Sequence, residues 1–168
     1  MLIDALDFGG AETHLYSLCY ALKKKGCDVI VASAGGKIAK MLQQVGIAHC
    51  YLPSFDIKIP ASSQNAKRRC SIFQSISRLL KIVKIERPDI IHAHTRRTAF
   101  IADLVCRATK IPLVCTAHAL FSMKGYKAAL SRWGEGTIAI SEDVAEHIVK
   151  HSLIKPKRVR IIRNGVFI

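Results

Sequence analysis

Short β-branched runs alternate with longer helical patterns along the whole chain, and this alternation most constrains the fold. Most of the runs are continuously apolar, as expected of parallel strands that helices cover on both faces. Such an alternation is typical of βαβ units. We therefore predict a single α/β domain over residues 1–168, built on a doubly wound, mostly parallel, Rossmann-like sheet. The expected strands span residues 2–6, 29–33, 47–52, 89–93, 113–117, 137–140 and 159–162.

Apolar residues spaced three and four apart predict helices between these strands. Ser141 has the position of an N-cap, with Glu142 in the first turn of the helix that follows. The segment 55–66 is expected to be the long loop of the chain. The expected helices lie near residues 15–25, 37–45, 72–83, 96–109 and 142–151. The residues expected to face inward are Ile72, Phe73, Ile76, Leu79, Leu80 and Val83 of the third helix, and Phe100, Ile101, Leu104 and Val105 of the fourth.

The chain has 26 Lys and Arg against 12 Asp and Glu, a formal net charge of +14. Anionic lipid, phosphorylated substrates and nucleic acid all attract such a surface, so charge alone does not choose among these partners. Half of the residues are apolar, which excludes intrinsic disorder. Asp4 and Asp7 stand where a signal peptide carries cations, so we expect a cytoplasmic protein. The six cysteines lack metal-ligand or redox spacing and are expected to be reduced core residues.

The candidate site lies beyond the carboxyl ends of the strands, because ligands bind a doubly wound sheet where its strand order reverses. The expected first and fourth strands are neighbours at that point. A pair of glycines after the first strand lets the backbone approach a ligand, and the next helix offers free N–H groups to an anion. The residues expected to converge there are Gly9, Gly10, His94, Arg96, Arg97 and His118.

Each of these features has a simpler interpretation. A Gly-Gly pair before a helix is often only a tight turn. His94 is either a structural residue or a ligand contact, and Arg96 and Arg97 form either a solvated helix start or an anion clamp. Metal binding by His92, His94 and His118 is disfavoured, because strand residues alternate between faces and no carboxylate or thiolate completes the set. The absence of G-x-G-x-x-G excludes a dehydrogenase.

Several motifs, in order and spanning nearly the whole chain, resemble one known family. These motifs are Gly9-Gly10-Ala11-Glu12-Thr13-His14, Gly26-Cys27-Asp28-Val29, Pro88-Asp89-Ile90-Ile91-His92-Ala93-His94, Thr116-Ala117-His118, Ala139-Ile140-Ser141-Glu142 and Ile162-Arg163-Asn164-Gly165-Val166. In these motifs the chain is similar to the amino-terminal domain of retaining glycosyltransferases of family 4, which have the two-domain GT-B architecture.

The resemblance implies transfer of a hexose or similar sugar from a nucleotide diphosphate sugar with retention, without a metal or other cofactor, in cell-surface glycan or glycolipid synthesis. The amino-terminal domain would bind the acceptor, and a carboxy-terminal domain would bind the donor. By resemblance, Gly9 and Gly10 lie against the donor phosphates, and His118 positions the transferred sugar. The implied acceptor side contains His94, Arg96, Arg97 and Thr116, and the implied interdomain cleft contains Ser141, Glu142, Asn164 and Gly165.

The chain departs from the family pattern where it stops, at Ile168, and at its first strand, which looks clipped. In the family the donor domain follows the position of Ile168, so we expect the isolated chain to be inactive. The alternatives are a non-catalytic subunit that docks onto a separate donor-binding polypeptide, or a truncated remnant. Nucleic-acid binding ranks lower, because no aromatic platform accompanies the charge. Residues 58–87 carry eight basic residues and one acidic residue, which suits peripheral binding to an anionic membrane at the inner face of the plasma membrane.

Overall fold

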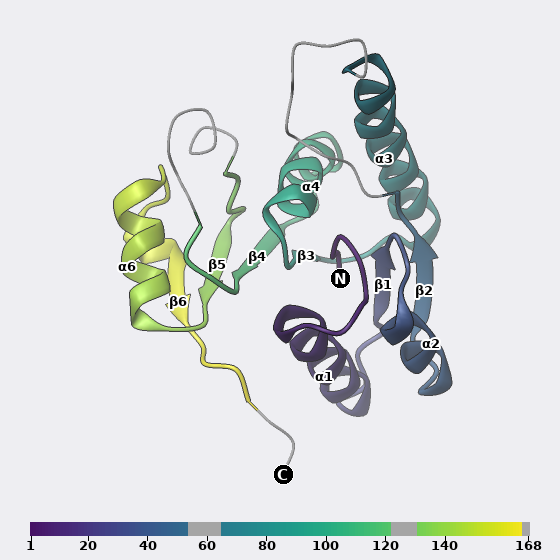
Figure 1. Cartoon of the computed structure of the whole chain (residues 1–168), viewed down its shortest axis with the longest axis horizontal. Coiled ribbons are helices and arrows are strands. Elements are labelled where there is room, and N and C mark those ends of the chain that lie inside the picture. Colours follow the sequence, from purple (N-terminus) through teal and green to yellow (C-terminus); the bar gives the residue numbers. More distant parts are fainter. Residues whose placement is uncertain (54–64, 122–130, 166–168) are drawn as a thin grey trace.

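Parallel strands form the centre of the molecule (Figure 1). The computed structural model describes residues 1–53, 65–121 and 131–165, with the backbone only for residues 65–71. β1 pairs with β2, and β3 to β6 pair in chain order, each pair parallel as predicted. The strands are β1 (Ile30–Ser33), β2 (Ala48–Tyr51), β3 (Ile91–Ala93), β4 (Leu113–Ala117), β5 (Gly136–Ala139) and β6 (Val159–Ile161).

The amino-terminal segment joins these two groups of strands. Leu2 forms parallel bridges to Ala32 of β1 and to Ala93 of β3. Its N–H donates to the carbonyl of His92 at 2.8 Å, and the N–H of His94 donates to the Leu2 carbonyl at 2.9 Å. The predicted place of the first strand beside the predicted fourth strand is therefore confirmed, and the segment lies between β1 and β3.

The predicted length of that first strand, residues 2–6, is wrong. Among the described residues, only Leu2 carries ladder bridges in this segment. Beyond Leu2 the backbone bonds lose the regular ladder pattern: the N–H of Ala34 donates to Asp4, the N–H of Leu6 donates to Gly35, and the Leu6 carbonyl accepts from Ile38 at the start of the second helix. These hydrogen bonds connect the segment to the loop after β1, and they do not extend the strand.

Helices cover both faces of the sheet, which is the doubly wound arrangement predicted from the sequence. Neighbouring residues enter different hydrophobic clusters: Leu2 and Ala32 join the cluster that includes α3, α4 and α6, whereas Ile3 and Val31 join the cluster of α1 and α2. Since successive strand residues point to opposite faces, the two clusters flank the sheet. The helices are α1 (Gly10–Lys24), α2 (Lys37–Gln44), α3 (Asn65–Glu86), α4 (Arg96–Thr109) and α6 (Glu142–His151).

The predicted inward faces of two helices are correct in part. Leu79 and Val83 of α3 and Ile101 and Val105 of α4 are buried. Phe73, however, is 70% exposed and Leu104 is 42% exposed, against the prediction. Each helix buries a narrower stripe than its apolar pattern suggests, because neighbours contact it along only part of its circumference.

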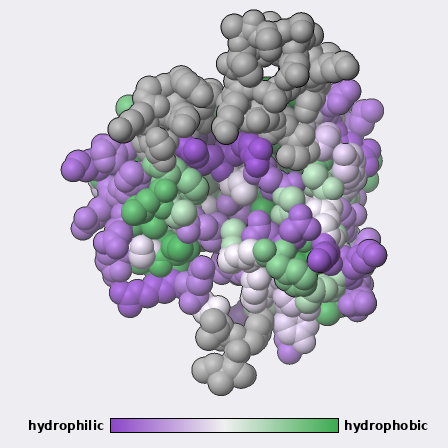
Figure 2. Space-filling model, viewed as in Figure 1, coloured by the Kyte–Doolittle hydropathy of each residue, from purple (hydrophilic) through white to green (hydrophobic). Residues whose placement is uncertain are grey.

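Apolar residues also reach the surface at the edge of the sheet. Figure 2 shows an apolar patch where α6 and β6 lie, with hydrophilic residues around much of the rim. Leu153, Ile161 and Ile162 are exposed in this part of the chain. β6 is the last strand in its sheet order, so its outer side has no strand partner among the described residues.

The cysteines follow the prediction only partly. The five described cysteines are free, as expected of reduced residues. Cys19, Cys106 and Cys115 are buried, but Cys27 is exposed and Cys50 is half-buried, so the prediction of a core position is wrong for these two. The side chain of Cys70 lies outside the described residues.

Candidate functional site

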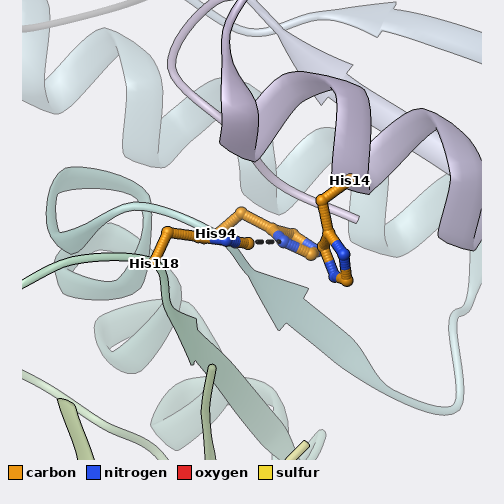
Figure 3. Close-up of side chains that lie close together, drawn as sticks. All are labelled: His14, His94 and His118. Atoms are coloured by element: carbon orange, nitrogen blue, oxygen red, sulfur yellow. Dashed lines mark hydrogen bonds between the residues drawn. The ribbon is translucent and has the colours of Figure 1, made fainter. Parts of the chain in front are cut away.

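Two histidines meet where neighbouring parallel strands end. His94 directly follows β3, and His118 directly follows β4. The strands pair with Ala93 opposite Cys115, which brings their carboxyl ends to one edge. Nδ1 of His94 and Nε2 of His118 are 3.1 Å apart and share a hydrogen bond (Figure 3). The predicted convergence of these two residues is thus confirmed.

A third histidine, His14, reaches the same place from α1 (Figure 3). Its ring centroid lies 5.2 Å from that of His118 and 6.0 Å from that of His94. His14 is not among the site residues predicted from the sequence. A signal was present, because His14 stands four positions after Gly10 and so on the same side of the helix that begins at the glycine pair.

Burial keeps the rings neutral near neutral pH. His94 is 1% exposed, and burial, followed by the neighbouring histidines, holds its pKa well below the usual 6.5. Burial also lowers the pKa of His118 to about 4 and lowers the pKa of His14. A neutral imidazole carries one N–H and one lone pair. Nε2 of His94 and Nδ1 of His118 are both buried without a hydrogen-bond partner among the described residues, so the pair offers an unused donor and an unused acceptor.

His92 and Thr116 form a second contact beneath this pair. Thr116 is 4% exposed, and its Oγ1 lies 2.7 Å from Nε2 of His92. The ring centroids of His92 and His94 are 4.2 Å apart. The prediction that alternation separates His92 from His94 is wrong, because residues two apart in a strand share a face. Thr116 therefore orients His92. The predicted contact of Thr116 with the acceptor stays a prediction.

The glycine pair lies at the amino end of α1, where the Glu12 carboxylate lies beside Gly9. Gly9 is the N-cap residue, and no side chain caps the helix. A Cβ built on Gly10 would meet nothing within 4 Å. The first N–H groups of a helix carry a partial positive charge and favour anions. The open space at Gly10 leaves room for a phosphate, whereas Gly9 already faces the Glu12 carboxylate. The predicted contact of Gly9 and Gly10 with the donor stays a prediction.

The two arginines at the start of α4 have different surroundings. Nε of Arg97 donates to Oδ2 of Asp4 at 2.9 Å, which ties α4 to the amino-terminal segment. The guanidinium of Arg96 lies over the ring of Phe121, 4.9 Å from its centroid, and burial lowers its pKa. Thr95 caps the helix by accepting from the N–H of Thr98. Arg97 thus has a structural ion pair, and the predicted acceptor contacts of both arginines stay predictions.

The predicted interdomain residues lie at the exits of β5 and β6. Oγ of Ser141 accepts from the N–H of Val144, which confirms the predicted N-cap. Glu142 is exposed and accepts from Nη2 of Arg163 at 2.8 Å. Its own backbone N–H and then Arg163 lower the pKa of Glu142. Asn164 and Gly165, which follow Arg163, are also exposed. The role of these residues in a cleft stays a prediction.

The sequence of the chain matches one protein family over nearly its whole length. The family model for Glycosyltransferase Family 4 matches residues 8–167. The chain belongs to glycosyltransferase family 4. This confirms the predicted family, and the GT-B structures it resembles confirm the predicted fold class.

The proteins that this chain is similar to are much longer than the chain itself. One component of the human phosphatidylinositol N-acetylglucosaminyltransferase is 27% identical over 95% of this chain and 34% of that protein. A glycosyltransferase from Rickettsia africae is similar in structure, with a TM-score of 0.75 and 22% identity, covering 98% of this chain and 43% of the other. The structure of HepE of Anabaena in complex with UDP-glucose is also similar, with a TM-score of 0.74 and 16% identity. The match covers 98% of this chain and 43% of HepE. The chain therefore spans between a third and a half of these relatives.

Membrane-spanning helices are not found in the described part of the chain. Within residues 1–53, 65–121 and 131–165, no helix is both long and apolar enough to cross a membrane. The side chains of Lys67, Arg68 and Arg69, which belong to the predicted membrane-binding segment, lie outside the described residues.

Proposed function

We propose that this chain binds the acceptor and part of the donor phosphate in a glycosyltransferase that uses a nucleotide diphosphate sugar and retains the anomeric configuration. The observation that supports this most directly is the juxtaposition of His118 and His94 with His14 on α1, the helix that begins at Gly9 and Gly10. An uncapped helix start suits a diphosphate, and neutral imidazoles suit sugar hydroxyls, which both donate and accept hydrogen bonds.

The proposed division of labour follows the burial of the two histidines. His118 is half-buried and is placed to contact a sugar, whereas His94 is buried behind it and orients it through their hydrogen bond. Transfer in this proposal involves no metal and no other cofactor. The HepE structure contains UDP-glucose, which supports a nucleotide sugar as the donor class.

We propose further that catalysis requires a donor-binding domain outside residues 1–168. The chain covers only 34% of the human relative and 43% of the Rickettsia glycosyltransferase. Electrostatic stabilisation of the leaving diphosphate usually makes a large contribution to catalysis. In this proposal the groups that provide it belong to the donor-binding domain, which faces the histidines across the cleft. A non-catalytic partner subunit or a truncated remnant remains the alternative to an acceptor domain that acts in transfer.

A reconstitution experiment tests this proposal. The 168-residue chain is assayed for sugar transfer alone and together with a family 4 donor domain, and the anomer of the product is assigned by NMR. We expect transfer only in the mixture, with retention. His118→Ala should abolish transfer, whereas His151→Ala, an exposed change on α6, should not. Turnover by the isolated chain would refute the need for a second domain, and an inverted product would refute retention.

We also propose peripheral association with an anionic membrane, where a lipid-linked acceptor would be reached. Tyr51 and Phe73, both exposed, line a hollow of about 520 Å³ beside the cations Arg78 and Lys81. Exposed aromatic rings next to cations suit the interface of an anionic bilayer. The double variant Phe73→Ser, Arg78→Gln should sediment less with phosphatidylserine vesicles than the wild type. Equal sedimentation, or equal binding to purely zwitterionic vesicles, would contradict this proposal.

A further inference from the structure

The three histidines at the site have the spacing of a metal-binding cluster. One ring nitrogen from each of His14, His94 and His118 lies within 4.8 Å of the other two. Nδ1 of His94 and Nε2 of His118 are 3.1 Å apart. Two nitrogens bound to one tetrahedral zinc ion, each at about 2.05 Å, lie about 3.3 Å from each other. Two of the three ligands therefore already have the separation that a single ion requires.

His14 needs only a small movement to complete the set. Its nitrogen must close from at most 4.8 Å to about 3.3 Å, a shift of roughly 1.5 Å that side-chain rotation can supply. His14 is half-buried on α1, so its ring has room on the solvent side. His94, by contrast, is held between strands and can provide a fixed ligand.

The donor set decides which ions suit the cluster. Imidazole is a good ligand for Zn²⁺, Co²⁺, Ni²⁺ and Cu²⁺, whereas Mg²⁺ and Ca²⁺ prefer oxygen. Histidine must be neutral to coordinate a metal, and burial favours the neutral form of all three rings. Three histidines with a fourth position left for an external ligand are a known donor set for zinc in enzymes. No carboxylate or thiolate is then needed.

We propose that His14, His94 and His118 form a binding site for one divalent transition-metal ion of the zinc class. The ion would take the place of the hydrogen bond between His94 and His118. It has no role in the proposed sugar transfer. Because it would occupy the imidazole assigned to the sugar, we expect Zn²⁺ to inhibit the assembled enzyme. Metal binding itself does not depend on the proposed function and can be measured on this chain alone.

Cobalt titration tests the site directly. Tetrahedral Co²⁺ bound by nitrogen ligands absorbs visible light far more strongly than the hydrated ion. We expect strong absorption that saturates at one equivalent, is bleached by Zn²⁺ and is unaffected by Mg²⁺. His14→Ala should weaken Co²⁺ binding by about tenfold or more, with far-UV circular dichroism to check that the chain is folded. His118→Asn is the second variant and should have the same effect.

The chain contains a matched control for nonspecific binding. His147 and His151 lie one turn apart on α6, with ring centroids 4.8 Å apart, and can attract metal independently. His151→Ala should leave the absorption unchanged. In the wild type, the ring resonances of the three site histidines should shift together on addition of one equivalent of Zn²⁺. The proposal is overturned if no tetrahedral absorption appears, if His151→Ala removes it, or if those resonances do not move.

Discussion

Arg97 donates a hydrogen bond from Nε to Oδ2 of Asp4 at 2.9 Å across 93 residues of sequence. Burial raises the pKa of the Asp4 carboxyl, while Arg97 acts in the opposite direction and lowers it. The pair attaches the central Leu2 segment to the first turn of α4. Replacing Arg97 by Met leaves a mostly buried carboxylate without this partner, and we expect a loss of about 1–3 kcal/mol in the free energy of unfolding, measured by urea denaturation.

An ion pair whose carboxylate has a second arginine provides the control for this prediction. Nε of Arg107 donates to Asp103 at 3.0 Å within α4, and the Arg107 side chain is 69% exposed. The Asp103 side chain is only 13% exposed, but its Oδ2 also lies 3.7 Å from Nε of Arg132, which stays in place when Arg107 is replaced. Pairs of this kind contribute little, so Arg107→Met should change the free energy of unfolding by less than about 0.5 kcal/mol. Equal losses in the two variants would show that Asp4 depends on Arg97 no more than Asp103 depends on Arg107.

The contact between Thr116 and His92 should also stabilise the fold. Thr116→Val keeps the shape of the side chain but removes the hydroxyl that meets Nε2 of His92 at 2.7 Å. We expect a loss of about 1–3 kcal/mol by urea denaturation, because the ring nitrogen is left without its partner. Thr116→Ser retains the hydroxyl and is the matched control. A valine variant at least as stable as the serine variant would contradict this interpretation.

Acid should destabilise the protein because buried neutral histidines take up protons more readily once the chain is unfolded. Burial lowers the pKa of His92 from 6.5 to about 3 and that of His118 to about 4. Between these values and 6.5 the unfolded chain binds more protons, so stability is fully present above pH 6.5 and falls as the pH decreases. At pH 5 the loss from His92 is on the order of 2 kcal/mol.

Denaturation at pH 7.5 and pH 5 measures this effect. We expect the difference in the free energy of unfolding between the two pH values to be smaller for His92→Gln than for the wild type. His151→Gln changes an exposed histidine and should leave the difference unchanged. An unchanged pH dependence in His92→Gln would show that His92 does not cause the loss of stability in acid.

Two glycines should respond in opposite ways to the same substitution. Gly36 has φ +141°, and a Cβ there would collide with the backbone carbonyl of Leu6, so Gly36→Ala should cost on the order of 1–3 kcal/mol or more. Gly10 has open space around it, so Gly10→Ala should unfold close to the wild type. If a diphosphate approaches Gly10, this variant should still weaken nucleotide-sugar binding in the assembled enzyme, measured by calorimetry. Unchanged affinity would exclude that approach.

Local sequence patterns were sufficient for most of the secondary structure. The predicted bounds of α4 (Arg96–Thr109) and β4 (Leu113–Ala117) agree with the structure, and Ser141 caps α6 as expected. Helix caps, apolar periodicity and continuous strand runs depend on residues a few positions apart, so they can be recognised without the fold. The motif order was likewise enough to identify the family.

The meeting of His14, His94 and His118 depended on tertiary structure. The sequence placed His94 and His118 at neighbouring strand ends, but the approach of His14 requires α1 to lie across that edge. The shortening of the first strand to Leu2 and the exposure of Phe73 also depended on segments far apart in the chain. Local patterns specify which elements form, because their causes are short-range. Which side chains meet, and which are buried, is decided by the packing of those elements against one another.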